Sequence, residues 1–151
     1  MILLALLLQV APAEEPVAPY VQSLANAGAR PIAGDGAWRA FHEHGGVRRI
    51  VDAFVARNLA DPRIGEIFKG QDIVRLRRVL NEQFCFLLGG GCIYSGRSMK
   101  DAHRNMGVQS ADIGALVENL QWAMGREGVP FFAQNRFLAK LAPMKRDVVE
   151  R

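Results

Sequence analysis

The chain has 151 residues, of which half are hydrophobic, and a formal net charge of +4. This length and this apolar share fit one domain with a buried core. The basic residues are scattered along the chain without a dense Lys/Arg tract, so we expect no nucleic-acid partner.

The first ten residues are apolar apart from Gln9, and Ala11-Pro12-Ala13 follows them. An apolar run that ends in a small-x-small pattern is typical of a secretory signal peptide, and this one is too short to span a bilayer. We therefore expect residues 1–13 to be a signal peptide, a periplasmic or secreted protein, and no membrane insertion after cleavage. No basic residue precedes the apolar run, and a segment that does not work as a signal would leave the protein in the cytoplasm.

Residues 14–36 are rich in Pro, Ala and Gly and show no sustained period. This composition predicts a flexible arm or linker, followed by one domain over residues 37–151. His42 and His44 are two positions apart, so in a helix they would point in different directions. We expect a solvated pair, with a metal role still open.

Helical spacing of apolar residues begins at Gly46 and predicts a helix that ends at Asp61-Pro62. A short helical turn holds Ile67 and Phe68 and stops at Gly70. The next predicted helix runs from Ile73 to Leu88. Its apolar stripe consists of Leu76, Leu80, Phe84 and Leu87.

Three glycines, residues 89–91, end that helix, and an irregular loop and a short helix over Met99–Arg104 follow. Ser110 is the expected N-cap of a helix that stops near Gly128. A last helix starts at Pro130, and Pro143 should end its regular part. Five or six helices without a strand indicate an all-α domain of crossing helices.

Sequence motifs of several enzyme classes are absent. The chain has no Gly-x-Ser-x-Gly elbow, no His-Glu-x-x-His and no Cys-x-x-Cys. These absences argue against a serine hydrolase of that type and against the common zinc sites. We therefore predict no catalytic residues.

Cys85 and Cys92 flank the glycine turn seven positions apart. In an oxidising compartment they could form a disulfide. The alternative is a small apolar residue on a helix and a separate loop thiol. The sequence leaves both readings open.

Residues 46–148 resemble the group-one truncated haemoglobins. The matching segments are Phe54, Leu59-Ala60-Asp61-Pro62-Arg63, Phe68-Lys69-Gly70, Leu88-Gly89-Gly90, Tyr94-Ser95-Gly96, Met99-Lys100-Asp101-Ala102-His103, Gly107-Val108, Asn119-Leu120, Gly128-Val129-Pro130 and Leu141-Ala142-Pro143. Gln83-Phe84-Cys85 and Gln134-Asn135-Arg136-Phe137 look like a proteobacterial, exported branch. The resemblance implies the two-over-two helical sandwich of truncated globins.

The resemblance also implies haem b, with His103 as the proximal iron ligand. Phe68 takes the position of an aromatic ring packed against the porphyrin. The other haem contacts implied are Met99 and Val108 near His103, and Leu76, Leu80 and Phe84 on the distal side. Tyr94 would reach a haem edge or propionate, or would be an exposed loop residue.

Two positions depart from the family pattern. Many members carry a Tyr and a Gln that hydrogen-bond bound oxygen, and Val55 and Leu80 occupy those positions here. Gln83, close to the same stripe, is the candidate donor that remains, with an exposed amide as the alternative. The family's glycine pair is also displaced: His42-Glu43-His44 stands where glycines are expected, and Gly45-Gly46 follows.

The resemblance implies reversible binding of a diatomic gas, oxygen or nitric oxide, at a pentacoordinate iron. Nitric oxide dioxygenation or redox sensing by the same haem is the enzymatic alternative, and it would need an electron donor that the sequence does not name. A cofactor-free helical interaction module is the rival from another class. His103 and Phe68 argue against that rival.

Overall fold

The structure, a computed structural model, describes residues 13–150. The expected signal peptide lies outside the described residues except for Ala13. Residues 13–150 contain no β-strand. Their α-helices and 3-10 helices (η) are, in chain order, η1 Leu24–Ala27, α1 Gly36–Ala40, α2 Glu43–Ala60, η2 Gly65–Phe68, α3 Ile73–Leu87, α4 Met99–Ala102, α5 Ser110–Arg126, α6 Phe131–Leu141, η3 Ala142–Met144 and α7 Lys145–Val148.

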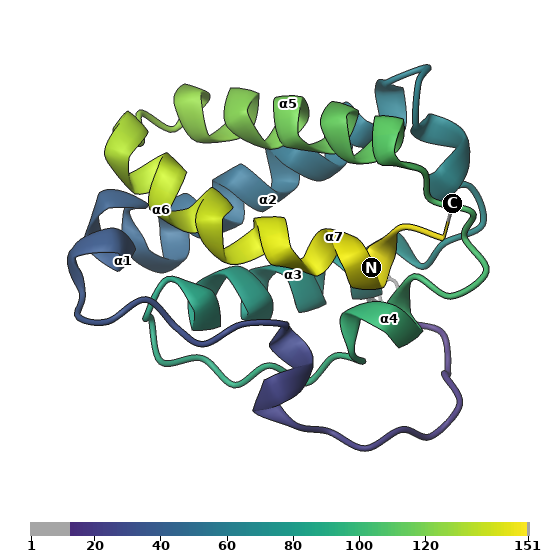
Figure 1. The fold of residues 1–151 in the computed structure, drawn as a ribbon. Helices are drawn as coiled ribbons and strands as arrows, with labels where there is room; N and C mark the ends of the chain where they lie inside the picture. The colour runs from purple at the N-terminus through teal and green to yellow at the C-terminus, as the bar shows by residue number, and fades with distance from the viewer. Residues whose placement is uncertain (1–12, 151) are drawn as a thin grey trace, which may run out of the picture.

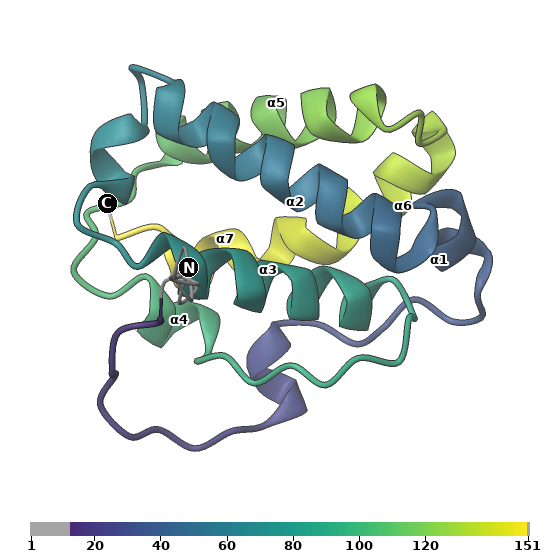
Figure 2. The same ribbon diagram turned by 180° about the vertical axis from the view of Figure 1, so that it is seen from behind.

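The long helices pack around α2. Helix α2 packs against both α3 and α5, and α6 continues through η3 into α7. Both views show α2 and α5 in one half of the molecule, and α3, α4 and α7 in the other (Figures 1 and 2). The expected all-α, two-over-two helical sandwich is confirmed.

The helix ends follow local signals in the sequence. The Asp72 carboxylate accepts a hydrogen bond from the Arg75 backbone N–H and so caps the start of α3. Gly128, with φ +79°, follows the end of α5 in the left-handed conformation that glycine adopts without strain. Helix α6 ends at Leu141, and the segment with Pro143 is a 3-10 turn, as the proline predicts.

The start of α2 differs from the sequence expectation. The chain already forms α1 at Gly36–Ala40, and α2 begins at Glu43 rather than Gly46, so His44 lies on a helix. His42 and Glu43 both have φ near +60°, which turns the chain sharply between the two helices. A Cβ on Gly46 would lie 1.9 Å from the Phe41 carbonyl oxygen, so this turn requires glycine.

The core is built around aromatic rings from four helices. Phe137 contacts Phe41 and Phe84 edge-on, with ring centroids 5.3 and 4.8 Å apart, and Phe84 lies 6.5 Å from Phe54. Phe41, Phe84 and Phe137 are each at most 2% exposed. These contacts hold α1, α2, α3 and α6 together through apolar burial.

A buried polar pair also joins α2 to α5. The Asn119 side-chain amide donates to the side-chain oxygen (Oδ1) of Asn58 at 2.9 Å and to the Asp61 carboxylate at 3.1 Å. Both asparagines are buried, and their mutual hydrogen bond offsets the cost of removing two amides from water.

The N-terminal segment contacts the rest of the protein. Tyr20 donates to the Ser95 carbonyl, the Ile32 backbone N–H donates to the Leu87 carbonyl, and Glu14 forms an ion pair with Arg78. Each contact reaches α3 or the loop that follows it. Residues 13–35 thus form a strap along this side of the fold. The flexible arm and the domain boundary at residue 37 remain predictions.

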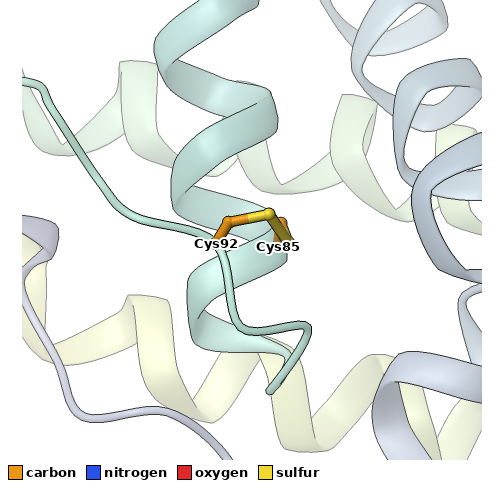
Figure 3. Close-up of a disulfide and its surroundings, with 2 residues drawn as sticks. All are labelled: Cys85 and Cys92. Atoms are coloured by element: carbon orange, nitrogen blue, oxygen red, sulfur yellow. A yellow bond between two sulfur atoms is a disulfide. The ribbon is translucent and has the colours of Figure 1, made fainter.

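A disulfide joins Cys85, near the end of α3, to Cys92 in the following loop, with the Cα atoms 5.6 Å apart (Figure 3). Of the two readings that the sequence left open, the structure shows the pair. Among the residues described, no helix is long and apolar enough to cross a membrane.

Candidate functional site

The candidate iron ligand, His103, is the residue that ends the short helix α4. The Ser98 hydroxyl caps the start of this helix by accepting from the Asp101 backbone N–H at 3.2 Å. The helix has only four residues, so His103 is held at its C-terminal end. Its ring is half-buried.

One hydrogen bond fixes the tautomer of His103. Its Nδ1 lies 2.7 Å from the Met99 carbonyl oxygen. A carbonyl oxygen can only accept, so Nδ1 must carry the proton and Nε2 must offer its lone pair. This carbonyl-to-imidazole arrangement is the one that orients metal-binding histidines.

Burial keeps the imidazole neutral. It lowers the pKa of His103 below its ordinary value, more than the hydrogen bond to Met99 raises it, and the positive charge of Arg97 acts in the same direction as burial. Only a neutral imidazole has a free lone pair for a metal ion.

Helix α7 and Glu150 contact α4 and the loop after His103. Helix α7 packs against α4, the Glu150 backbone N–H donates to the Val108 carbonyl at 2.9 Å, and the Glu150 carboxylate accepts from the Gly107 N–H at 3.2 Å. Val108, an expected contact near His103, is buried at 2% exposure. Residues near the end of the chain therefore fix the position of the candidate ligand.

A set of half-buried apolar side chains packs against one buried core from several helices. It includes the expected contacts Leu76, Leu80 and Met99 and also Ile73, Leu116, Leu138 and Leu141. Phe68 is half-buried on η2. Apolar side chains that stay half-exposed leave hydrophobic surface for a flat apolar group to cover.

The expected distal residues Val55 and Phe84 lie deeper than this set. Val55 is 1% exposed on α2, and Phe84 is 2% exposed within the aromatic core. The sequence could not tell whether these side chains contact haem or fill the core, because both roles need an apolar residue on the inner helix face.

Gln83 does not extend toward open space. Its amide nitrogen donates to the Ala27 carbonyl at 2.9 Å and lies 3.4 Å from the Met99 sulfur. The side chain is therefore buried under the N-terminal strap. The sequence left open a hydrogen-bond donor to bound oxygen or an exposed amide here. The exposed amide is wrong, since Gln83 is 5% exposed, and the donor role stays a prediction.

Tyr94 is also buried rather than an exposed loop residue. Its hydroxyl donates to the Arg97 carbonyl at 2.8 Å, and burial raises its pKa to about 12. The ring supports the loop before α4, and its hydroxyl is already engaged within that loop.

The donor set and its surroundings fit haem. A neutral imidazole with a free Nε2 suits the iron, and the half-buried apolar side chains suit the porphyrin. Arg97 and Lys100 lie just before His103 and carry the charge that carboxylate groups at a haem edge require. Ile73, Leu116, Leu138 and Leu141 also pack against the core as half-buried apolar residues, and the sequence analysis did not single them out.

Comparison with known proteins identifies relatives of this chain. The model of the bacterial-like globin family matches residues 39–150. The chain is similar to the group 1 truncated haemoglobin GlbN of Mycolicibacterium paratuberculosis, with 30% identity over 105 residues that span 70% of this chain and 77% of the relative. It is also similar to GlbN of Synechocystis, with 31% identity over 67% of this chain and 86% of the relative.

Solved structures show the same fold. The truncated haemoglobin of Tetrahymena pyriformis in its Fe(III) form superposes with a TM-score of 0.72 at 24% identity, covering 76% of this chain and 98% of that one. The 2/2 haemoglobin of Synechococcus, solved in the cyanomet state with covalently attached haem, has a TM-score of 0.70 at 22% identity, with the same coverage.

Proposed function

This chain belongs to the bacterial-like globin family, and on that premise we propose that it binds haem b through His103 and holds oxygen or nitric oxide on a pentacoordinate iron. The observation that carries the proposal is the hydrogen bond from His103 Nδ1 to the Met99 carbonyl. It leaves Nε2 free and keeps the ring from turning.

Each part of the site would have a separate task. Haem supplies the iron on which a diatomic gas binds. His103 would hold the iron, and the capping of α4 by Ser98 would fix the position of the His103 ring. The apolar side chains of α3 and α5 would exclude water from the porphyrin, which favours reversible ligand binding over loss of an electron to solvent.

The ligand-binding side would be apolar. Val55 and Leu80 offer no hydrogen-bond donor, and the Gln83 amide nitrogen donates to the Ala27 carbonyl and to the Met99 sulfur. This apolar pocket would bind a gas with little charge as tightly as a polar pocket would. It would bind polarised oxygen more weakly. This favours gas binding over nitric oxide dioxygenation, which must retain oxygen and also needs an electron donor.

We also propose that the protein is exported, as a member of a proteobacterial branch of the family, to the periplasm or the exterior. Support comes from the apolar residues 1–10 with the Ala11-Pro12-Ala13 pattern, and from the disulfide, a bond that oxidising compartments maintain.

The test of haem binding is the visible absorption spectrum of the purified chain. We expect a haem spectrum for the parent, and loss or strong weakening of haem retention in His103→Gly, because the iron loses its protein ligand. Added imidazole should restore the five-coordinate spectrum of that variant by filling the vacated position. His42→Asn, a change at an exposed histidine, is the matched control and should retain haem.

Two results would contradict the proposal. A His103→Gly spectrum identical to that of the parent would show that another residue holds the iron. A parent chain that folds but takes up no haem would favour the cofactor-free interaction module.

A further inference from the structure

The disulfide has an imidazole beside it. The ring of His44, on the first turn of α2, and the sulfur atoms of Cys85 and Cys92 lie with their ligand atoms within 4.8 Å of one another. Cys92 comes from the loop and Cys85 from α3, as Figure 3 shows. Three separate segments thus bring one nitrogen and two sulfurs together.

Packing holds these three groups in place. The His44 ring stands edge-on to the Trp38 ring, with centroids 4.9 Å apart. A Cβ on Gly90 would lie 2.7 Å from the Cys85 sulfur and 2.8 Å from the Trp38 ring, so the loop passes directly over the disulfide. The backbone around the cysteines is therefore fixed by contacts other than the disulfide itself.

We propose that reduction of the disulfide converts this cluster into a zinc site with His44, Cys85 and Cys92 as ligands. This goes beyond the proposed function, since it uses neither haem nor His103. Two thiolates and one imidazole, with a water molecule in the fourth position, form a recognised tetrahedral zinc set. In such a site, with Zn–S bonds of about 2.3 Å in tetrahedral geometry, the two sulfurs stand about 3.8 Å apart.

The chemistry of the switch balances with a dithiol as reductant. One thiolate of the dithiol attacks the Cys92 sulfur, which is half-buried, and the buried Cys85 leaves as a thiolate. The second thiolate of the dithiol then displaces Cys92 and forms the reductant's own disulfide, so two electrons pass to the protein. Binding of Zn²⁺ to the two thiolates releases to solvent any protons they had taken up.

The cluster lies on a hollow through which a metal ion can reach it from solvent. This hollow of about 300 Å³ is lined by His44, Cys85 and Cys92 together with Arg48, Asn81 and Glu82. Arg78, on the same hollow, has its charge matched by Glu14 and Glu82.

The experiment uses the full purified chain, either oxidised or treated with a phosphine reductant that binds zinc weakly. Both samples are dialysed against buffered Zn²⁺, and the bound metal is counted by mass spectrometry. We expect one zinc per reduced chain and none on the oxidised chain. Cobalt in place of zinc should show the absorption of thiolate ligands only in the reduced sample.

A matched pair of histidine variants assigns the third ligand. His44→Asn should weaken zinc binding at least about tenfold, because the loss of even an outer partner of a metal ligand costs about 10- to 100-fold. His42→Asn makes the same change two positions away, where the ring contacts Glu127, and should leave zinc binding unchanged. His44→Phe keeps a ring against Trp38 but offers no ligand, and it should resemble His44→Asn.

Absence of zinc on the reduced chain would overturn the proposal. Equal zinc on oxidised and reduced chains would overturn it as well, since the metal would then sit elsewhere. Equal affinity in His44→Asn and the parent would remove His44 from the site. The comparison needs no cysteine variant, so it holds even where Cys85→Ser or Cys92→Ser fails to fold.

Discussion

Val55 illustrates how a single residue sets the polarity of the proposed ligand pocket. It is 1% exposed on α2, at a position where many truncated haemoglobins carry Tyr. Bound oxygen carries partial negative charge, and a hydrogen bond to such a group is worth about 1.5 to 3 kcal/mol. Carbon monoxide is less polar when bound and depends less on such a donor.

We therefore expect Val55→Tyr to slow oxygen release about 10- to 100-fold, since each 1.4 kcal/mol corresponds to a factor of about ten. Val55→Phe is the matched control, because it adds the same ring without the hydroxyl. Carbon monoxide release should be nearly the same in both variants and in the parent. Stopped-flow measurements of the two release rates check this.

Gln83 is the alternative hydrogen-bond donor to bound oxygen. Because its amide nitrogen donates to Ala27, we expect Gln83→Leu to leave oxygen release unchanged. A parent that releases oxygen slowly and becomes fast only in Gln83→Leu would contradict the apolar pocket and show that Gln83 is the donor.

Among the elements, the contact between α2 and the end of α5 depends on an ionised carboxylate. Glu127 accepts hydrogen bonds from Arg49 and lies 3.0 Å from His42 Nδ1. The Arg49 hydrogen bonds, above all, hold the pKa of Glu127 at about 2, below the ordinary 4.5. A carboxyl with a lowered folded-state pKa stabilises the fold above its unfolded pKa, and this contribution is lost as the pH falls through the folded value.

Glu127→Gln should therefore make the free energy of unfolding less dependent on pH between about pH 5 and pH 2. Urea unfolding at several pH values, followed by circular dichroism, measures this dependence. Glu66→Gln, at an exposed side chain of η2, is the control and should keep the slope of the parent. Equal slopes in Glu127→Gln and the parent would contradict the role of the α2–α5 contact.

The link between α3 and its following loop is covalent. The Cys85–Cys92 bond closes a loop of sequence separation 7, for which the chain-entropy model gives about 2 to 3 kcal/mol of stabilisation. Reduction in the absence of zinc should lower the free energy of unfolding by about that amount, as urea titration would measure.

A Cys85→Ser/Cys92→Ser double variant is the control and should not respond to the reductant. Two free thiols in unfolded, unreduced protein from an oxidising compartment would rule the bond out.

At the scale of the whole molecule, the export proposal concerns the segment that precedes the strap. Glu14 and Glu15, which follow the expected cleavage position, contact α3 through Arg78 and Asp72. We expect mature exported protein to begin at Glu14, because Ala11-Pro12-Ala13 fits a signal peptidase. N-terminal sequencing or intact mass of native material measures this. A retained segment 1–13 in exported protein would contradict cleavage there, and a cytoplasmic location would contradict the signal.

Much of the fold was predictable because it depends on local signals. The apolar period predicted α2, α3, α5 and α6, and Gly128 and Pro143 predicted where two of them end. The start of α2 was predicted wrongly at Gly46. A close approach between Gly46 and the Phe41 carbonyl decides that turn, and hydrophobic periodicity carries no information on such contacts.

The sequence by itself determined the helical class and the ends of several helices, since these depend on residue type and on spacing within a few turns. His103 became the candidate ligand through the resemblance to truncated haemoglobins. Only the tertiary structure decided which residues are in contact. Gln83 donates to Ala27, Tyr20 donates to Ser95, and His44 lies beside the two cysteines, across separations of more than 40 residues. The physical reason is that a helical period shows which face of a helix is apolar, whereas the partner of that face is set by chain packing far away in sequence.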